Sequence, residues 1–193
     1  MNEKALHQQM IEWRHYLHQH PESAFEEENT ARFVADKLEA LGLTVYRNIG
    51  KTGVVGVLKC GDGKGVIGIR ADMDCLQMVE QGDVPYKSQT ENRMHACGHD
   101  GHTAMVLGAA HLLAARKNFN GTVCFVFQPA EEPGKGAQAI LDDGFIERFG
   151  IEEIYGLHNM PGMRTGTIST RVGGIMGSED NFIIRIKGQG SHA

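Results

Sequence analysis

HTAMVLGAAHLLAAR (residues 102–116) and TVCFVF (residues 122–127) are the two stretches that decide the fold of this chain. The first is rich in Ala and Leu and predicts a buried helix, and the second is a continuous apolar run typical of a buried strand. Similar short runs at 54–58, 66–69 and 154–157 predict further strands. Because strands alternate with helices, the sequence predicts an α/β fold with a mostly parallel sheet flanked by helices.

Two amphipathic helices are expected before the first of these strands. Apolar residues recur at steps of four, three and four at Leu6, Met10, Trp13 and Leu17, which predicts a helix that ends near His20. A second helix is expected over about 26–40, and a short one over about 136–142. Beyond Pro161, the segments 165–170 and 181–187 have a strand-like composition.

The composition excludes several classes of partner. The chain has 193 residues, of which 41% are hydrophobic and 22% are charged, and a net charge of −5 gives no basic footprint for nucleic acid or anionic membrane. No run of apolar residues is long enough to span a membrane, and the N-terminus lacks the apolar core of a signal peptide. The four cysteines are scattered without paired spacing, which favours a reducing, cytoplasmic location.

The richest cluster of chemical groups is the run from Met94 to Thr103, which holds one thiol, three imidazoles and one carboxylate. Sulfur, imidazole nitrogen and carboxylate oxygen are the ligands that zinc and similar divalent metals prefer. Cys97 and His99 stand two residues apart around Gly98, so their side chains would point the same way on an extended segment. This pattern predicts a metal site.

A pair of adjacent acidic residues, Glu131 and Glu132, follows the predicted strand 122–127. Adjacent side chains diverge on an extended chain, so the two carboxylates are not expected to reach the same metal ion. One carboxylate could then hold the metal while the other acts as general base toward water. The pattern favours a catalytic pair over a solvated pair of surface charges.

Further polar residues stand at the ends of other predicted strands. Asp72 and Asp74 share one face and are candidates either for metal ligation or for orienting a ligand imidazole, and His158 is a fourth candidate ligand. Five histidines are expected on helix surfaces without a role, and two are expected to be neighbours of the site. The first group is His7, His15, His18, His20 and His111, and the second is His95 and His102.

Five ordered motifs carry a family resemblance over essentially the whole chain. They are ADMD (71–74), NRMHACGHDGHTA (92–104), FQPAEEPGKGA (127–137), GLHNMPG (156–162) and KGQGSHA (187–193). Together they resemble the M20 metallopeptidase family, in particular its amidohydrolase branch of hippurate hydrolases, N-acyl-amino-acid amidohydrolases and auxin-conjugate hydrolases. The resemblance implies a zinc-exopeptidase-like catalytic domain.

The resemblance also implies residue roles around two divalent metal ions, which would be Zn, Mn, Co or Ni. Cys97 would bridge the ions, while His99, Glu132 and His158 would complete most of the coordination. Glu131 would be the general acid and base, and Asp74 would support the metal site. Asp72 stands where other branches carry a ligand histidine, so it has no assigned role.

The resemblance further implies a catalytic domain over residues 1–178 and the beginning of a lid and dimerisation domain over 179–193. We expect the sequence to be part of a longer protein that forms a homodimer through the lid, and the 193-residue chain alone to have little activity. His192 would reach across the dimer to stabilise an oxyanion.

The predicted function is metal-dependent cleavage of the amide bond in a small N-acyl amino acid, such as hippurate or an N-acetyl amino acid. A di- or carboxypeptidase on the same scaffold is the first alternative. The second alternative is a metal-binding fragment without catalytic activity, because one metal ligand that the family carries near its C-terminus is missing.

Overall fold

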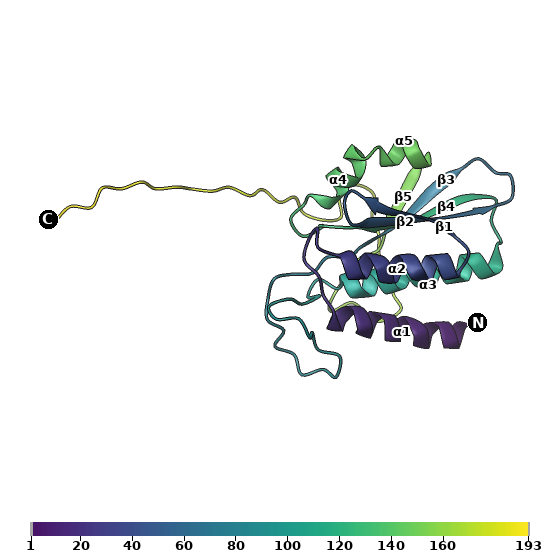
Figure 1. Cartoon of the computed structure of the whole chain (residues 1–193), viewed down its shortest axis with the longest axis horizontal. Helices are drawn as coiled ribbons and strands as arrows, with labels where there is room; N and C mark the ends of the chain where they lie inside the picture. Colours follow the sequence, from purple (N-terminus) through teal and green to yellow (C-terminus); the bar gives the residue numbers. More distant parts are fainter. Residues whose placement is uncertain (1, 193) are drawn as a thin grey trace. The chain divides into compact units, whose positions relative to one another are not determined.

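The computed structural model describes residues 2–192, and the chain divides into two units, Met1–Asn159 and Met160–Ala193. The first unit is a five-stranded sheet with helices on both faces (Figure 1). Its helices are α1 (Glu3–Gln19), α2 (Glu28–Ala40), α3 (His99–Arg116), α4 (Gly136–Asp142) and α5 (Phe145–Phe149). Its strands are β1 (Thr44–Ile49), β2 (Gly53–Cys60), β3 (Val66–Asp72), β4 (Gly121–Gln128) and β5 (Glu153–Gly156).

The strands lie in the order β1-β2-β4-β3-β5, so β4 occupies the centre of the sheet. Strand β3 runs parallel to both β4 and β5, whereas β2 runs antiparallel to both β1 and β4. The α/β class is therefore confirmed, but the sheet is mixed rather than mostly parallel. The link between β1 and β2 is too short for the crossover that parallel neighbours need, and it closes a hairpin instead.

Alternation along β4 builds two cores. Phe125 and Phe127 pack with α1, α2 and α3 on one face of the sheet, while Cys124 and Val126 pack with α4 and α5 on the other. Because helices cover both faces, residues 123–127 of β4 are all apolar, which explains the continuous apolar run in the sequence.

The sequence did not predict two elements, β1 and α5. Strand β1 lies at the edge of the sheet and buries only one of its six residues, so its sequence, TVYRNI, carries neither a continuous apolar run nor a clean alternation. Helix α5 has five residues, which is too short for a helical period to be recognised. The other predicted elements of the first unit are present within a few residues of the expected bounds.

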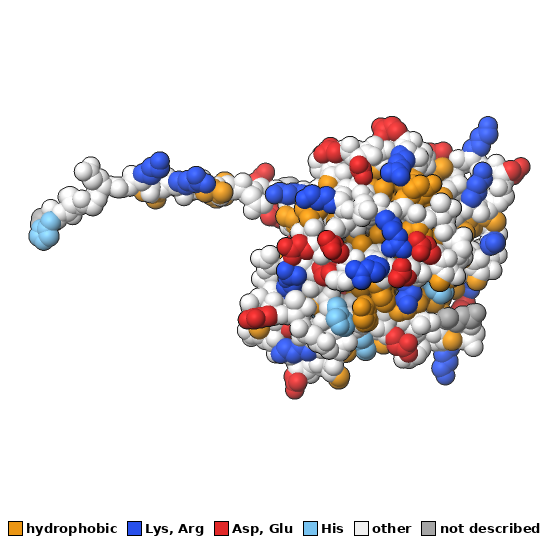
Figure 2. Space-filling model, viewed as in Figure 1, with side chains coloured by type: hydrophobic (Ala, Val, Ile, Leu, Met, Phe, Trp, Pro, Cys, Tyr) orange, Lys and Arg blue, Asp and Glu red, His pale blue; other side chains and the backbone are white. Residues whose placement is uncertain are grey.

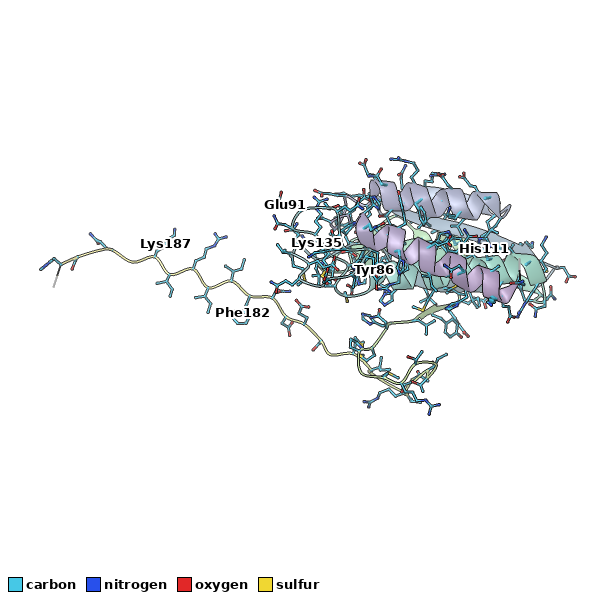
Figure 3. The ribbon with its side chains drawn as sticks, turned by 90° about the horizontal axis from the view of Figure 1, so that it is seen from below. Tyr86, Glu91, His111, Lys135, Phe182 and Lys187 are labelled. Carbon is cyan, nitrogen blue, oxygen red and sulfur yellow. The ribbon has the colours of Figure 1, made fainter. Side chains whose placement is uncertain are left out.

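The second unit, residues 160–192 as described, contains neither helix nor strand. The expectation of strands at 165–170 and 181–187 was therefore wrong. A strand needs a neighbour for its backbone hydrogen bonds, and none of the residues described pairs with these segments. Phe182 and Lys187 stand on extended chain in Figure 3, and Phe182 is 82% exposed. The expected division into residues 1–178 and 179–193 stays a prediction.

Acidic and basic side chains are mixed over the face of the first unit shown in Figure 2, with apolar atoms between them. Across residues 2–192, no helix has the length and apolar character needed to cross a membrane.

Candidate functional site

The polar residues singled out in the sequence gather at one edge of the sheet. Asp72 is the last residue of β3, and the Glu131–Glu132 pair begins three residues after the end of β4. His158 follows β5, which is parallel to β3, and His99 is the first residue of α3. Since β3, β4 and β5 are parallel, their carboxyl ends meet, which is where ligands bind in open α/β sheets.

His99 lies at the centre of this cluster and is 1% exposed. Its Nε2 atom lies 3.6 Å from Asp72 Oδ2, 3.7 Å from Glu131 Oε2 and 3.8 Å from Glu132 Oε1. Its Nδ1 atom lies 2.8 Å from the backbone oxygen of Asp74, which can only accept a hydrogen bond, so the proton sits on Nδ1. The other ring nitrogen, Nε2, therefore faces three carboxylates. Burial lowers the pKa of His99, but the carboxylates of Asp74, Asp72 and Glu132 outweigh burial and raise that pKa.

This arrangement fits a bound cation. Among the residues described, neither His99 Nε2 nor Glu132 Oε1 has a hydrogen-bond partner, although both atoms are buried. Buried polar atoms without partners are rare in proteins, and a nitrogen lone pair facing carboxylate oxygens is repelled unless positive charge lies between them. Imidazole and carboxylate groups together form a donor set suited to zinc and similar metals.

A second pair of candidate ligands adjoins His99. Cys97 Sγ lies 3.3 Å from His158 Nε2, and the ligand atoms of Cys97, His99 and His158 all lie within 4.8 Å of one another. Two further groups meet the same limit and also contain His99: Glu131 with Glu132, and Asp72 with His102. The structure thus brings together the four predicted ligands and the predicted base, with His99 shared by every group.

The prediction that Cys97 and His99 point the same way because they lie on an extended segment was wrong. They do not lie on an extended segment, because Gly98 between them has φ 97° and ends the loop directly before α3. That left-handed conformation favours glycine. A Cβ atom at this position would also lie 2.3 Å from the side-chain oxygen of Asn159.

The thiol of Cys97 depends on positive charge for ionisation. Burial, with the nearby carboxylates of Glu132, Glu131 and Asp72, raises the pKa of Cys97 to about 11. A thiolate is therefore unfavourable here without a neighbouring cation, which disfavours a free cysteine nucleophile and agrees with a metal ligand.

The two glutamates do not diverge as the sequence predicted. The chain leaves the extended conformation at Ala130, where φ is 47°, and turns over residues 131–134. Both carboxylates consequently come within 3.8 Å of His99 Nε2. Asp74, which is fully buried, fixes this turn, because its two carboxylate oxygens accept the backbone N–H groups of Glu131 and Glu132 at 3.0 Å each.

Asp72, which had no assigned role, contacts both His102 and Arg70. Its Oδ1 lies 2.6 Å from His102 Nδ1, and its Oδ2 lies 2.7 Å from Arg70. His102 Nε2 in turn accepts the backbone N–H of Asn159 at 3.2 Å. Burial raises the pKa of Asp72, but the hydrogen bond from His102 and the charges of His99 and Arg70 outweigh burial and hold the pKa well below its usual range.

His102 was expected to be only a neighbour of the site. It instead connects Asp72 to the loop that carries His158, and its ring contacts the His158 ring with centroids 4.6 Å apart. Sequence spacing could not reveal this link, since it depends on how α3 lies against the loop after β5.

The expectation that His18 is an inert surface residue was wrong. His18 is 4% exposed, and its Nδ1 lies 2.8 Å from Asp100 Oδ2 while its Nε2 lies 3.2 Å from Glu80. Arg14, also on α1, contacts the same Asp100 oxygen at 3.1 Å. The N-terminal helix is thereby tied to the residue that follows His99. His111, another expected surface residue and labelled in Figure 3, packs against Trp13, with the ring centroids 5.1 Å apart.

His95 is also buried, and burial lowers its pKa to about 4, so it is neutral at pH 7. His192 belongs to the second unit, and its role stays a prediction.

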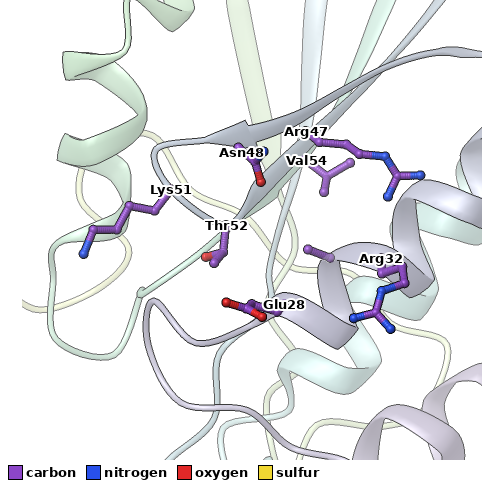
Figure 4. A pocket seen from close by; sticks show the side chains of 8 residues that line it. Glu28, Arg32, Arg47, Asn48, Lys51, Thr52 and Val54 are labelled. Carbon is purple, nitrogen blue, oxygen red and sulfur yellow. The ribbon is translucent and has the colours of Figure 1, made fainter.

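Two pockets of the first unit lie apart from the cluster around His99. One, of about 300 Å³, is lined by α2 and the β1–β2 hairpin (Figure 4). Of its cations, Arg47 pairs with Asp36 and Glu39, and Lys51 lies over the Phe25 ring. The other, of about 290 Å³, is an apolar groove between α4, α5 and β5. Neither includes a predicted ligand or the predicted base.

Comparisons with known proteins identify the family of this chain. Residues 68–190 match the model of Peptidase family M20/M25/M40. The chain is 49% identical over 179 residues to a hippurate hydrolase of Campylobacter jejuni, covering 93% of the chain and 46% of that protein. It is 43% identical over 199 residues to an N-acetylcysteine deacetylase of Bacillus subtilis, covering 100% of the chain and 51% of that protein.

A crystal structure of a Bacillus subtilis protein, described as a dinuclear metal binding peptidase from the M20 family, superposes with a TM-score of 0.79 at 41% identity. That match covers 83% of this chain and 45% of the other. The chain thus spans about half the length of the relatives that it matches. The resemblance read from the five motifs is confirmed, and the chain belongs to Peptidase family M20/M25/M40.

Proposed function

We propose that this chain carries the metal site of an amidohydrolase that cleaves the amide bond of N-acyl amino acids. The observation that carries the proposal is the buried Nε2 atom of His99, which faces three carboxylates and has no hydrogen-bond partner among residues 2–192. Cys97, His99, Glu132 and His158 would hold two divalent ions. Zn, Mn, Co and Ni all suit these donors.

Divalent metal at this site would polarise the substrate carbonyl and lower the pKa of water. The protein's own part in the reaction is proton transfer and positioning. Glu131 is the better placed of the two glutamates for contact with water, because its side chain is 40% exposed against 22% for Glu132. Glu131 takes a proton from the attacking water as the C–O bond forms, and gives it to the amide nitrogen as the C–N bond breaks.

Asp74 holds the backbone of both glutamates and so sets the position of the base relative to the ligands. His192 is proposed to stabilise the oxyanion from a partner subunit, within a homodimer formed through a lid domain. A cytoplasmic location and the domain division at residue 178 belong to the same proposal.

The names of the relatives support small acylated amino acids as substrates, because they include a hippurate hydrolase and two N-acetylcysteine deacetylases. A carboxypeptidase activity is the second candidate. It is supported by two relatives from Saccharolobus solfataricus named thermostable carboxypeptidases, which are 37% and 38% identical to the chain.

The direct test is an assay of the intact, metal-reconstituted protein against hippurate, N-acetyl amino acids and unblocked dipeptides. We expect turnover of the acylated amino acids and little turnover of the dipeptides. Preference for dipeptides would establish the second candidate instead. Stoichiometric metal binding without turnover of any of these substrates would contradict both enzymatic proposals.

A further inference from the structure

A second buried carboxylate lies behind the glutamate pair, and neither the motifs nor the proposed mechanism includes it. Glu27 precedes α2 and has no exposed surface. Its Oε1 accepts the backbone N–H of Ala130 at 2.8 Å, and its Oε2 accepts the hydroxyl of Thr52 at 2.5 Å. Thr52 also lines the pocket shown in Figure 4.

The burial of the Glu27 side chain is not explained by capping of α2, the helix that Glu27 precedes. Its side chain forms no capping hydrogen bond at the start of α2. Glu22 does that instead, because its carboxylate accepts the backbone N–H groups of Asn29 and Thr30. Glu27 is not held by a counter-ion either, since no Lys, Arg or His in the described part of the chain forms an ion pair with it. A buried carboxylate without a cation is costly, and burial raises the pKa of Glu27, while the hydrogen bonds from Thr52 and Ala130 stabilise the ionised form.

The residue that Glu27 holds is itself in an unusual conformation. Ala130 has φ 47°, in the left-handed region that costs a non-glycine residue about 1–3 kcal/mol. Its carbonyl oxygen accepts the backbone N–H of Gly136 at 2.8 Å, which closes the turn that carries Glu131 and Glu132. The turn therefore needs support from outside, and Glu27 supplies it at the first residue.

Three successive backbone N–H groups, those of Ala130, Glu131 and Glu132, thus point at two fully buried carboxylates. Glu27 holds the first, and Asp74 holds the second and third. The N–H groups of Glu131 and Glu132 converge on one anion, Asp74, and successive N–H groups that do so form an anion-binding concavity. The orientation of these peptides decides where the two glutamate side chains project, and both project toward His99 Nε2.

We propose that Glu27 is a positioning residue for the metal ligand Glu132 and the base Glu131, acting through the backbone N–H of Ala130. This inference rests on the proposed function for the roles of the two glutamates. The hydrogen bond to the Ala130 N–H requires an oxygen acceptor at position 27 but not a negative charge. A neutral glutamine at this position should therefore perform the same role as the glutamate.

The test compares Glu27→Leu, which has no acceptor, with Glu27→Gln, which keeps one, in the intact protein. Glu28→Leu is the matched control, because Glu28 is the exposed neighbour. Residues that orient metal ligands typically contribute roughly 10- to 100-fold to metal affinity or activity. We expect Glu27→Leu to weaken Co²⁺ binding by about that factor in a spectroscopic titration, and to speed amide hydrogen exchange at Ala130. Glu27→Gln and Glu28→Leu should leave both unchanged.

Turnover gives a second readout, in which kcat should fall for Glu27→Leu while KM stays near its wild-type value. If Glu27→Leu folds but binds Co²⁺ like the wild type, the proposal is overturned. If it does not fold, Glu27→Asp replaces it, since the shorter side chain keeps the charge but withdraws the acceptor from Ala130. Wild-type affinity in that variant is then the overturning result. Failure of the wild type to hydrolyse any acyl amino acid would refute the proposed function alone, because the Co²⁺ titration does not depend on turnover.

Discussion

A carboxylate can accept two N–H groups side by side, and Asp74 uses both of its oxygens in this way. Asp74→Asn would turn one of these oxygens into an NH₂ group, which would leave a buried backbone N–H without an acceptor. Such a loss typically costs about 1–3 kcal/mol. We expect the free energy of unfolding, measured in urea, to fall by about this amount. Asp83→Asn, at an exposed position, is the control and should have no effect.

The two glutamates make a matched pair at the same scale. General acid–base residues typically contribute roughly 10²–10⁴-fold to rate, so Glu131→Gln should lose that much turnover in the intact protein while it keeps its metal. Glu132→Gln should instead lose metal, measured by atomic emission after dialysis. If the two variants behaved in the opposite way, the roles of Glu131 and Glu132 would be reversed.

At the scale of elements, the start of α3 depends on Gly98. Gly98→Ala would place a side chain at φ 97° and against Asn159, so we expect a loss of about 1–3 kcal/mol in unfolding free energy together with weaker metal binding. Gly101→Ala lies three residues further along, within α3, and no atom lies within 4 Å of the added methyl group. It should stabilise the helix by up to about 1 kcal/mol. Equal effects of the two substitutions would contradict this account.

The attachment of α1 to α3 should depend on pH. The hydrogen bond to Asp100 outweighs burial, and with the contact to Glu80 it raises the pKa of His18 above its usual value. Arg14 and His95 are the positively charged and titratable groups that face the same network. Protonated His18 therefore stabilises the fold fully below the unfolded-state pKa of about 6.5, and this contribution is lost as pH rises through the raised pKa.

Urea unfolding at a series of pH values should show this loss in the wild type and not in His18→Asn. A wild-type profile that matches the variant over the same range would rule out the contribution of His18.

The sequence predicted the secondary-structure elements better than the contacts between distant residues. Buried helices and strands such as 102–116 and 122–127 were predicted because burial on both faces imposes an apolar composition. The candidate site was predicted as a set of residues, since Cys97, His99 and Glu132 have the chemistry of ligands wherever they lie. The roles of His18, Glu27 and His102 could not be predicted, because each depends on which distant backbone or carboxylate the fold places beside it.

At the scale of the whole molecule, the first unit leaves apolar surface open. Leu141, Ile154 and Tyr155 are 48%, 50% and 55% exposed in the groove between α4, α5 and β5, and β5 pairs on one side only among the residues described. Large apolar patches and unpaired strand edges promote association. We expect residues 1–193 purified alone to self-associate, measured by analytical ultracentrifugation, and to bind metal weakly.

Ile154→Lys should reduce this self-association. Val79→Lys, at a residue 58% exposed outside the groove, should not. If residues 1–193 formed a monodisperse monomer at micromolar concentration, the groove would not mediate self-association.

Because β4 lies at the centre of the sheet, its neighbours β2 and β3 stay partly unpaired while the chain is being synthesised. Strands β2 and β3 both leave the ribosome before β4, yet β4 lies between them and pairs with both. At typical translation rates, roughly 5–20 residues per second, the two earlier strands wait several seconds with their inner edges unpaired. A codon change that slows synthesis between residues 73 and 120 would therefore lengthen the time for which β2 and β3 expose unpaired strand edges. The finished fold would stay the same. Newly made chains, more than mature ones, should depend on chaperones that shield such edges.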